Sequence, residues 1–147
     1  MQRASVRFQL VLFAYLQVCT WLPLGPWNGQ YDFELPDALY PIMGALELVF
    51  VWGFVRWNRW LVGAAVLGHL LWLWLQIDSW WIRYIEGYPP GGRAFYEAHF
   101  AGTWKLLPST GDHLAPDAMH LVLQVLIVCV LVTATLDIRG HVRARHA

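Results

Sequence analysis

Apolar residues run through this chain in four long stretches, and polar residues gather in the segments between them. The stretches cover Val6–Leu24, Tyr40–Trp57, Trp60–Trp81 and Ala118–Ile138. Each is close to the length of about 20 residues that a helix needs to cross the hydrocarbon core of a bilayer. Because lipid offers no partner to open backbone groups, each stretch must be helical. The pattern predicts an all-α integral membrane protein, a four-helix transmembrane bundle built as one domain over residues 1–147.

The first stretch differs from a cleaved signal peptide. Arg3 and Arg7 before an apolar run fit the start of such a signal, but residues 19–23 contain no small-x-small cleavage site. Val18 stands where a lipoprotein signal needs a small residue. We therefore expect an uncleaved first span.

Basic and acidic residues are unevenly divided between the connecting segments. The two termini and the short connection between the second and third stretches hold most of the ten basic residues, namely Arg3, Arg7, Arg56, Arg59, Arg139, Arg143 and Arg145. The other two connections and their borders hold most of the ten acids, namely Asp32, Glu34, Asp37, Asp78, Glu86, Glu97, Asp112 and Asp117. An excess of basic residues marks the cytoplasmic side of a membrane protein. We expect a multi-pass protein of the cell membrane with both termini in the cytoplasm.

The two outer connections differ in length and character. Residues 25–39 contain Pro26, Gly29 and Pro36 and should be irregular. Residues 82–117 are longer and contain a sharp turn at residues 88–92. The spacing of aromatic residues then predicts an amphipathic helix over Arg93–Leu107 on the membrane surface, ended by Pro108 and Gly111. Loops of this length often act as lids or binding loops.

Composition narrows the class of partner. The chain is 58% hydrophobic and 14% charged, with ten tryptophans and a formal net charge of zero. A protein that binds nucleic acid needs a strongly basic face, so we expect the lipid bilayer and no nucleic acid as partner.

Four polar side chains stand about six or seven residues from the outer end of their spans. They are Gln17, Glu47, Gln76 and Gln124. At a rise of 1.5 Å per residue they form one layer roughly 10 Å below the outer surface. Polar groups inside a membrane are costly and tend to mark function.

Helical phase places further candidates beside this layer. His69, Trp72 and Gln76 share one stripe of the third span, because they are three, four and seven residues apart. Asp117, His120 and Gln124 share a stripe of the fourth span in the same way. We expect the two stripes to face each other.

Glu47 and Asp117 each admit a structural and a functional interpretation. A protonated Glu47 could bond to Gln17, Gln76 or Gln124 and hold the helices together. It could instead exchange a proton with a lipophilic substrate, or pair with the cation of a ligand. Asp117 follows Pro116, so it could begin the fourth helix, or it could line the mouth of a pocket.

Metal, haem and thiol chemistry have weaker signals. His99, His113 and His120 with Asp117 could supply ligands for zinc, iron or manganese, but Pro116 interrupts their helical spacing and no H-E-x-x-H motif occurs. His69 and His120 differ by more than about 10 Å in expected depth, too far to share one haem iron. No C-x-x-C is present. We expect no cofactor.

These observations predict a polar pocket in the outer half of the bundle that holds a lipophilic small molecule. Glu47, His120 and Asp117 would carry acid/base chemistry such as that of an isomerase or cyclase. The ligand-binding residues would be Gln17, His69, Trp72, Gln76 and Gln124. Two alternatives remain open: a non-catalytic accessory subunit that docks a membrane-protein partner or a second copy of itself, and a metal-dependent membrane enzyme that uses His99, His113, Asp117 and His120.

Overall fold

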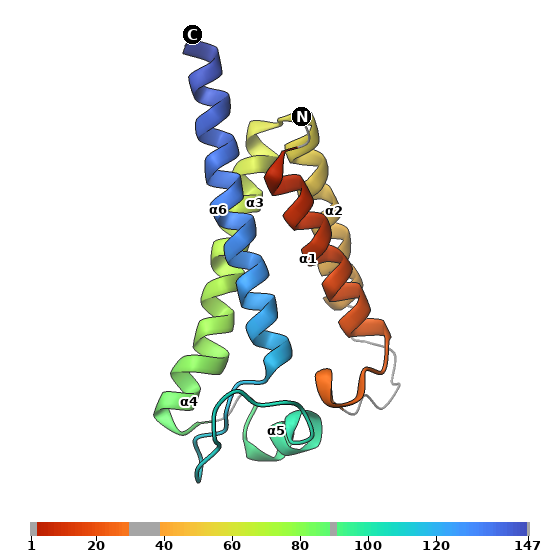
Figure 1. The fold of residues 1–147 in the computed structure, drawn as a ribbon, viewed down its shortest axis with the longest axis vertical. Helices are drawn as coiled ribbons and strands as arrows, with labels where there is room; N and C mark the ends of the chain where they lie inside the picture. Colours follow the sequence, from red (N-terminus) through yellow and green to blue (C-terminus); the bar gives the residue numbers. More distant parts are fainter. Residues whose placement is uncertain (1–2, 30–38, 89–90, 147) are drawn as a thin grey trace.

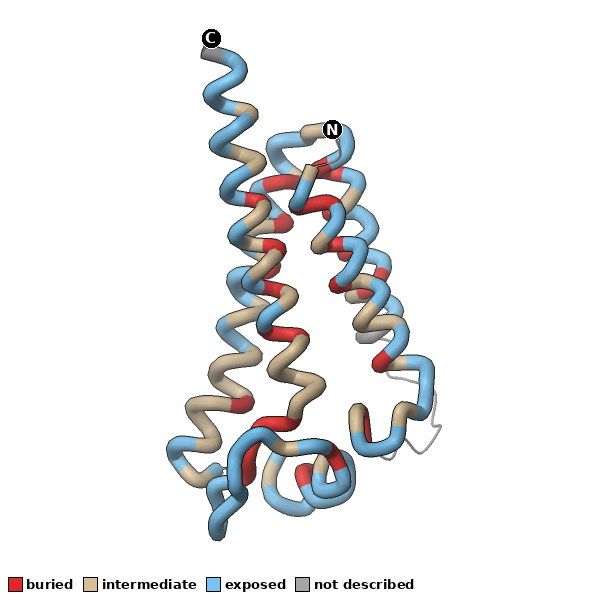
Figure 2. Tube along the Cα trace, in the orientation of Figure 1, coloured by how far each residue is buried: buried red, intermediate tan, exposed pale blue. Residues whose placement is uncertain are grey.

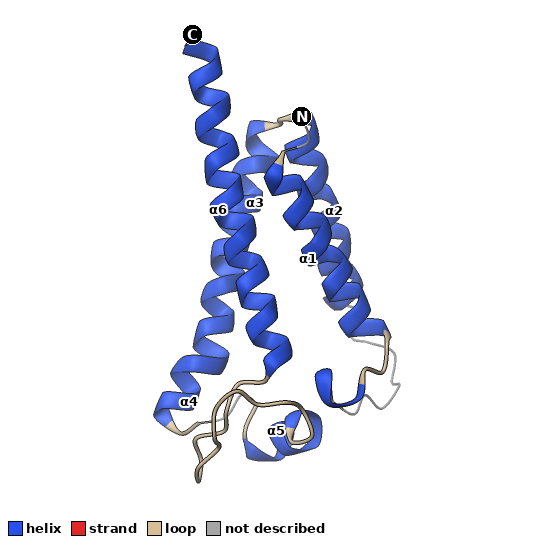
Figure 3. Cartoon of the chain, viewed as in Figure 1, coloured by secondary structure: helices blue, strands red, loops and turns tan. Residues whose placement is uncertain are grey.

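The protein folds into helices joined by turns and loops. The structure, a computed structural model, describes residues 3–29, 39–88 and 91–146. Among these residues there are two isolated β-bridges and no β-strand (Figure 3). The four long helices are α1 (Ala4–Trp21), α2 (Leu39–Arg56), α3 (Arg59–Gln76) and α6 (Ala118–His146).

The helices begin within a few residues of the predicted positions, and two of them extend further than predicted. A π-helix, η2 (Ile77–Ile82), continues α3 into α4 (Arg83–Glu86), so that Arg59–Glu86 is one helix of 28 residues. Gly87, in the left-handed conformation, ends it. The last helix continues past Ile138 to His146.

Two helices in the described residues are long and apolar enough to cross a membrane. They are the continuous helix Arg59–Glu86 and the helix over Ala118–Arg145, judged by length and composition. Arg7, Gln9 and Gln17 lower the mean hydropathy of α1. An all-helical chain with two candidate membrane-spanning helices is therefore established for the described part of the sequence.

The four long helices lie side by side (Figure 1). The first packs against α2 and α6, and α3 packs against the same two helices. The start of α1 and the turn between α2 and α3 lie at the same end of the molecule as the C-terminal part of α6, which projects past them; we call this the terminal end (Figure 1). Residues 91–117, which we call the lid segment, cover the opposite end, the lid end (Figure 1).

Apolar side chains fill the space between the helices in two clusters. The cluster nearer the terminal end contains Val6, Phe50, Phe54, Val62, Ala65 and Ala134. The second contains Leu12, Leu123, Ile127 and Val130. Buried positions recur along the facing sides of the helices, and exposed positions along their outer sides (Figure 2). Gly53 allows the close approach of α2 and α3, since a Cβ there would lie 2.5 Å from Leu61 Cβ.

The turn between α2 and α3 combines a strained residue with a helix cap. Trp57 has φ of 54°, which is unusual for a bulky residue. Asn58 is the N-cap of α3 and its Oδ1 accepts hydrogen bonds from the backbone N–H of Trp60 and Leu61 at 3.0 and 3.3 Å.

The amphipathic helix of the lid segment is shorter than predicted. It is α5 (Arg93–Phe100), and the prediction that it reaches Leu107 is wrong. The reason lies at its C-terminus, where the carbonyl oxygen of Phe100 accepts bonds from the backbone and hydroxyl of Thr103 and from Lys105 Nζ. Tyr96 and Phe100 turn inward against Trp80.

Backbone hydrogen bonds fasten the lid segment to its neighbours. The N–H of Trp104 donates to the carbonyl of Pro26 at 2.8 Å, and the N–H of Ala118 donates to the carbonyl of Trp104 at 2.8 Å. Tyr96 Oη donates to the carbonyl of Ala115 at 2.6 Å. The lid segment is therefore a packed cover. The predicted irregular loop over residues 25–39 lies mostly outside the described residues, as do residues 89–90 of the predicted turn at 88–92.

Asp117 connects the lid segment to α6, and its loss should lower stability. Its Oδ1 accepts the backbone N–H of His120 at 2.8 Å and caps the helix, and the residue is fully buried. Asp117→Ala should lower the free energy of unfolding by about 2 kcal/mol, because a cap and a buried hydrogen bond are lost together. Thermal unfolding in mild detergent measures the change.

Asp112→Ala is the matched control, because it removes an exposed carboxylate whose partner is Arg93. Its cost should stay within about 0.5 kcal/mol. Equal losses in the two variants would contradict the role of Asp117 as the anchor.

Candidate functional site

Glu47 and His69 form a buried pair between α2 and α3. Glu47 Oε2 lies 3.2 Å from His69 Nε2, and both side chains are almost completely buried. The two atoms are close enough for an ion pair, although they are not aligned as a linear hydrogen bond. The other carboxyl oxygen, Oε1, is buried without a hydrogen-bond partner among the described residues.

The far side of the His69 ring determines how the pair can be protonated. His69 Nδ1 lies 2.7 Å from the carbonyl oxygen of Ala65, and because a carbonyl can only accept, Nδ1 must carry a hydrogen. The nitrogen that faces Glu47 is then either a bare acceptor beside a protonated carboxyl or an N–H beside a carboxylate. In an apolar interior a net charge is costly. The pair should therefore share one proton between Glu47 and Nε2.

A small cavity opens beside this pair. It measures about 90 Å³ and its lining is Met43, Leu46, Glu47, Phe50, Gly68, His69 and Trp72. The cavity reaches the surface between α2 and α3, where Leu46 is 47% exposed. Since a water molecule occupies about 30 Å³ of liquid, the cavity has room for a few heavy atoms. It can hold the polar end of a ligand whose apolar body lies outside.

The contact between Glu47 and His69 could have been predicted from the sequence by counting residues from the turn between the second and third spans. Glu47 stands ten residues before Trp57, and His69 stands eleven residues after Asn58. In an antiparallel hairpin, residues at equal distances from the turn lie at the same level. Counting from the less certain outer ends placed His69 well below Glu47. The shared turn is the better reference.

The expected layer of four polar side chains does not form one network. Gln17 Oε1 accepts from Trp21 Nε1 at 3.0 Å, and Gln124 Oε1 accepts from Trp81 Nε1 at 2.7 Å. Gln76 Oε1 is buried without a described partner. The polar partner of Glu47 is instead His69, so the expected bonds from Glu47 to the three glutamines are absent from the described contacts.

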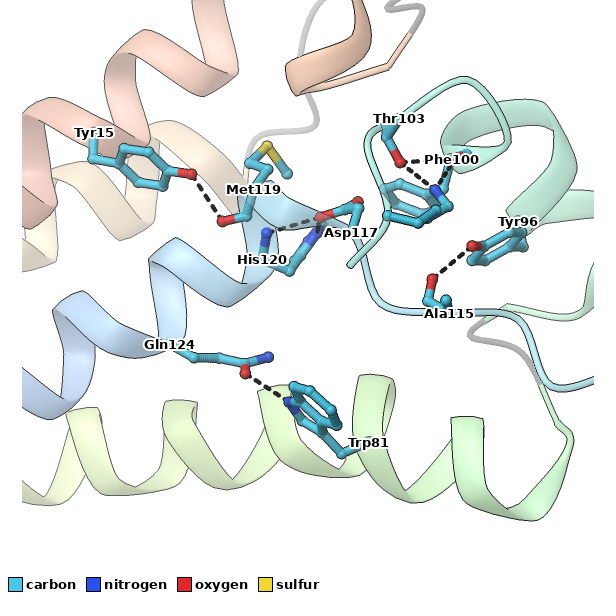
Figure 4. Close-up of polar contacts among 11 residues, drawn as sticks. Tyr15, Trp81, Tyr96, Phe100, Thr103, Ala115, Asp117, Met119, His120 and Gln124 are labelled. Carbon is cyan, nitrogen blue, oxygen red and sulfur yellow. Dashed lines mark hydrogen bonds and ion pairs between the residues drawn. The ribbon is translucent and has the colours of Figure 1, made fainter. Parts of the chain in front are cut away.

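The stripe on the fourth span meets the π-helix that follows α3 at the lid end, whereas His69 on the third span faces Glu47 of α2. Besides the bond from Trp81 to Gln124, the rings of Trp80 and His120 lie 4.1 Å apart (Figure 4 shows Trp81, Gln124 and His120). The π-helix contains both tryptophans and directs them toward α6. A π-helix inside an α-helix is often associated with function.

His120 and Asp117 form a second pair, under the lid segment. His120 Nδ1 lies 2.8 Å from Asp117 Oδ1, the oxygen that also caps α6 (Figure 4). A carboxylate on Nδ1 orients an imidazole and leaves Nε2 for acid/base work. The interpretation of Asp117 as the start of the helix is also correct, because its Oδ1 caps α6. The same oxygen contacts the His120 ring, so the cap and the pair occur together.

The two pairs are separate in the structure. No described contact joins Glu47 to His120 or Asp117, and the last two do not line the cavity. Of the residues predicted to bind a ligand, His69 and Trp72 line it, whereas Gln17, Gln76 and Gln124 do not. The cavity lies about midway along α2, at the level of Glu47, whereas the sequence analysis predicted a pocket that extends through the outer half of the bundle.

Burial also changes the titration of groups in the lid segment. Desolvation raises the pKa of Tyr96 to about 12, and the charge of Asp117 adds to this effect. Desolvation lowers the pKa of Lys105, partly offset by the negative charge of Asp117. The Lys105 ammonium also lies 5.0 Å from the centre of the Tyr96 ring. These groups consolidate the lid around Asp117.

The histidines considered as metal ligands do not converge. His99 Nδ1 contacts the carbonyl of Phe95, and His113 Nδ1 contacts the carbonyl of Tyr84. Within residues 3–29, 39–88 and 91–146, no three histidine, cysteine, aspartate or glutamate side chains are arranged to hold a metal ion.

Two buried polar features escaped sequence reasoning. Gln9 is fully buried, and neither of its amide atoms has a partner among the described residues. Asp137 Oδ2 accepts the backbone N–H and the hydroxyl of Ser5 at 3.0 and 2.6 Å. The spacing of Ser5 and Gln9, one helical turn apart, was the available signal.

A double-mutant cycle should show that Glu47 and His69 are coupled energetically. Glu47→Leu and His69→Leu each leave one buried polar partner, so each should cost about 1–3 kcal/mol. The double variant should cost at least about 1 kcal/mol less than the sum. Glu47→Gln should cost less than Glu47→Leu, because its amide can donate to Nε2. Unfolding in detergent supplies the four free energies.

The control cycle combines Glu47→Leu with Thr135→Val, an exposed position on α6 whose hydroxyl bonds its own helix. Those two changes should be additive within about 0.5 kcal/mol. Additivity of Glu47→Leu and His69→Leu would show that the pair is not coupled.

Comparison of this chain with protein-family models, with curated proteins and with solved structures found no match. Its function is therefore inferred from the contacts, burial and charge of the described residues.

Proposed function

We propose that all four long helices span a membrane, with both termini and the turn between α2 and α3 on the cytoplasmic side. The support is the outer surface of the helices, where large apolar side chains are exposed on each one, for example Val11, Ile42, Leu67 and Val132. Exposed apolar surface of this extent is unfavourable in water and favourable in lipid. The division of arginines and acids between the two ends gives the orientation.

Within this arrangement, the cavity beside Glu47 and His69 binds the polar end of a lipophilic small molecule. The observation that carries the proposal is the buried Glu47–His69 pair, whose Oε2 and Nε2 atoms lie 3.2 Å apart in the lining of an otherwise apolar cavity. The opening between α2 and α3 faces lipid, so a ligand enters from the bilayer. Glu47 Oε1, which has no partner among the described residues, is the atom available to the ligand.

The chemistry that fits this pair is a proton shift within one molecule. If the pair takes a proton from the ligand, ligand and pair become an ion pair with no net charge. The pair can then return the proton to a different atom, and no water or external proton enters the balance. General acid/base catalysis of this kind suits an isomerase or a cyclase. Asp117 and His120 hold the lid closed and take no direct part.

The proposed topology predicts which positions react from each side of the membrane. In a variant without native cysteines, Leu106→Cys on the lid segment should react with an impermeant maleimide added to intact cells. Arg145→Cys at the end of α6 should react only after the membrane is permeabilised. Labelling of both positions in intact cells would contradict the topology.

If the cavity holds a ligand, a larger side chain that fills it should prevent the ligand from binding. A Cβ at Gly68 would already lie 3.3 Å from the Phe50 ring, so Gly68→Leu should occupy the cavity. The wild-type protein in mild detergent should show an adduct of a few hundred daltons in a native mass spectrum. Gly68→Leu should lose it. Glu47→Gln should weaken it if the carboxyl holds the ligand.

Gly63→Leu on the same helix is the matched control, because a Cβ there meets nothing within 4 Å. It should keep the adduct. A wild-type mass without an adduct, or one that carries another polypeptide, would overturn the pocket and favour the accessory subunit.

A further inference from the structure

The terminal end concentrates positive charge without carboxylate partners. Arg3, Arg7, Arg56, Arg59, Arg139, Arg143 and Arg145 all belong to this end of the helices. Asp137 is the acidic residue at this end of the helices, and its Oδ2 accepts hydrogen bonds from the backbone N–H and the hydroxyl of Ser5. In the part of the chain that the structure describes, none of these seven arginines forms an ion pair. Among the described residues these guanidinium groups therefore lack an ion-pair partner, and Asp137 is the one carboxylate side chain near them.

Three of these arginines lie over tryptophan rings. The distance from the guanidinium carbon to the ring centre is 4.5 Å for Arg3 and Trp57, 4.6 Å for Arg56 and Trp52, and 5.0 Å for Arg59 and Trp60. Trp52 is 53% exposed and Trp60 is 75% exposed. A cation over an exposed ring contributes about 0.5–1 kcal/mol. This contribution is too small to explain why two large indole rings are exposed at the surface. Tryptophan prefers the headgroup region of a bilayer.

Trp57 brings three elements together at one corner. Its ring has Arg3 from the start of α1 at 4.5 Å and the ring of His141 from α6 at 4.0 Å. Its φ of 54° is a strained conformation for a large side chain. Strain of this kind tends to persist where the surroundings impose it and often marks function. The corner is built by contacts between segments that are distant in the sequence.

We propose that Arg3, which lies over Trp57, together with Arg56 and Arg59, which flank the turn at Trp57 and Asn58, binds the phosphate of an anionic phospholipid in the cytoplasmic leaflet. Guanidinium groups present paired donors that match phosphate oxygens, and the indoles set the depth of the headgroup. The site rests on the proposed membrane topology and is independent of the Glu47–His69 cavity. The part of α6 that projects past the other helices (Figure 1) presents Arg143 and Arg145 to the surface without a described aromatic partner.

The test compares phosphatidylglycerol with phosphatidylcholine of the same acyl chains, bound to the full-length protein and counted by native mass spectrometry. The wild-type protein should retain phosphatidylglycerol in preference. Arg3→Gln combined with Arg59→Gln should weaken this binding about 30-fold, since each basic residue near an anionic headgroup contributes a factor of about five. Arg143→Gln combined with Arg145→Gln, the same change in charge, should leave it nearly unchanged.

Two further measurements make the result specific. Arg3→Lys combined with Arg59→Lys keeps the charge and should retain part of the binding, which separates loss of the site from loss of the fold. Equal binding of the two lipids by the wild-type protein, or equal losses in the two glutamine variants, would overturn the proposal. Displacement of phosphatidylglycerol by millimolar inorganic phosphate would show a site for free phosphate and overturn the assignment to lipid. The maleimide labelling tests the topology separately.

Discussion

The hydrogen bond from His69 Nδ1 to the carbonyl of Ala65 is the contact on which the proposed chemistry of this protein depends most. It fixes the tautomer of a buried imidazole and directs the opposite nitrogen at Glu47. A neutral histidine with a free tautomer could satisfy a carboxylate or a carboxylic acid equally well. Because Nδ1 donates to Ala65, the pair is neutral only when one proton lies on either Nε2 or the Glu47 carboxyl. Any other protonation state places a net charge in an apolar interior, which is costly. A single backbone contact one helical turn away thus sets which nitrogen of His69 faces the carboxyl of Glu47 in this two-residue unit.

Neighbouring residues support that unit by packing. The pair lies beside two apolar clusters, one toward each end of the helices, and the aromatic rings of Phe50 and Trp72 lie near His69. Gly68 leaves the space beside Phe50 that becomes the cavity. The lid end has a different task. There Asp117 caps α6, orients His120 and fixes the chain that returns from α5, so its polar groups are used in holding the cover in place.

The two ends of the molecule thus use charge in opposite ways. At the lid end, carboxylates and cations meet one another, as Arg93 does with Asp112 and Glu97. At the terminal end three of the seven arginines lie over tryptophan rings and none forms an ion pair with a described carboxylate, which leaves a positive surface for an external anion. The difference agrees with a molecule whose ends face unlike surroundings, and it links the proposed orientation to the proposed phospholipid site.

The sequence alone determined the helices and their approximate limits, because apolar runs and helical periodicity are local properties. The face that α6 buries, with Leu123, Ile127, Val130 and Ala134, lies beside the stripe predicted from Asp117, His120 and Gln124. The sequence identified Glu47, His69 and Trp72 individually, and it placed Asp117 at the start of α6. Which residue Glu47 meets was decided only by tertiary structure, because the level of one helix against the next depends on the turn that joins them. The end of α5 at Phe100 was likewise decided by contacts with Thr103 and Lys105 that lie outside the helix. Gln9 and the cavity beside Gly68 depend on how four helices meet, which no local pattern encodes.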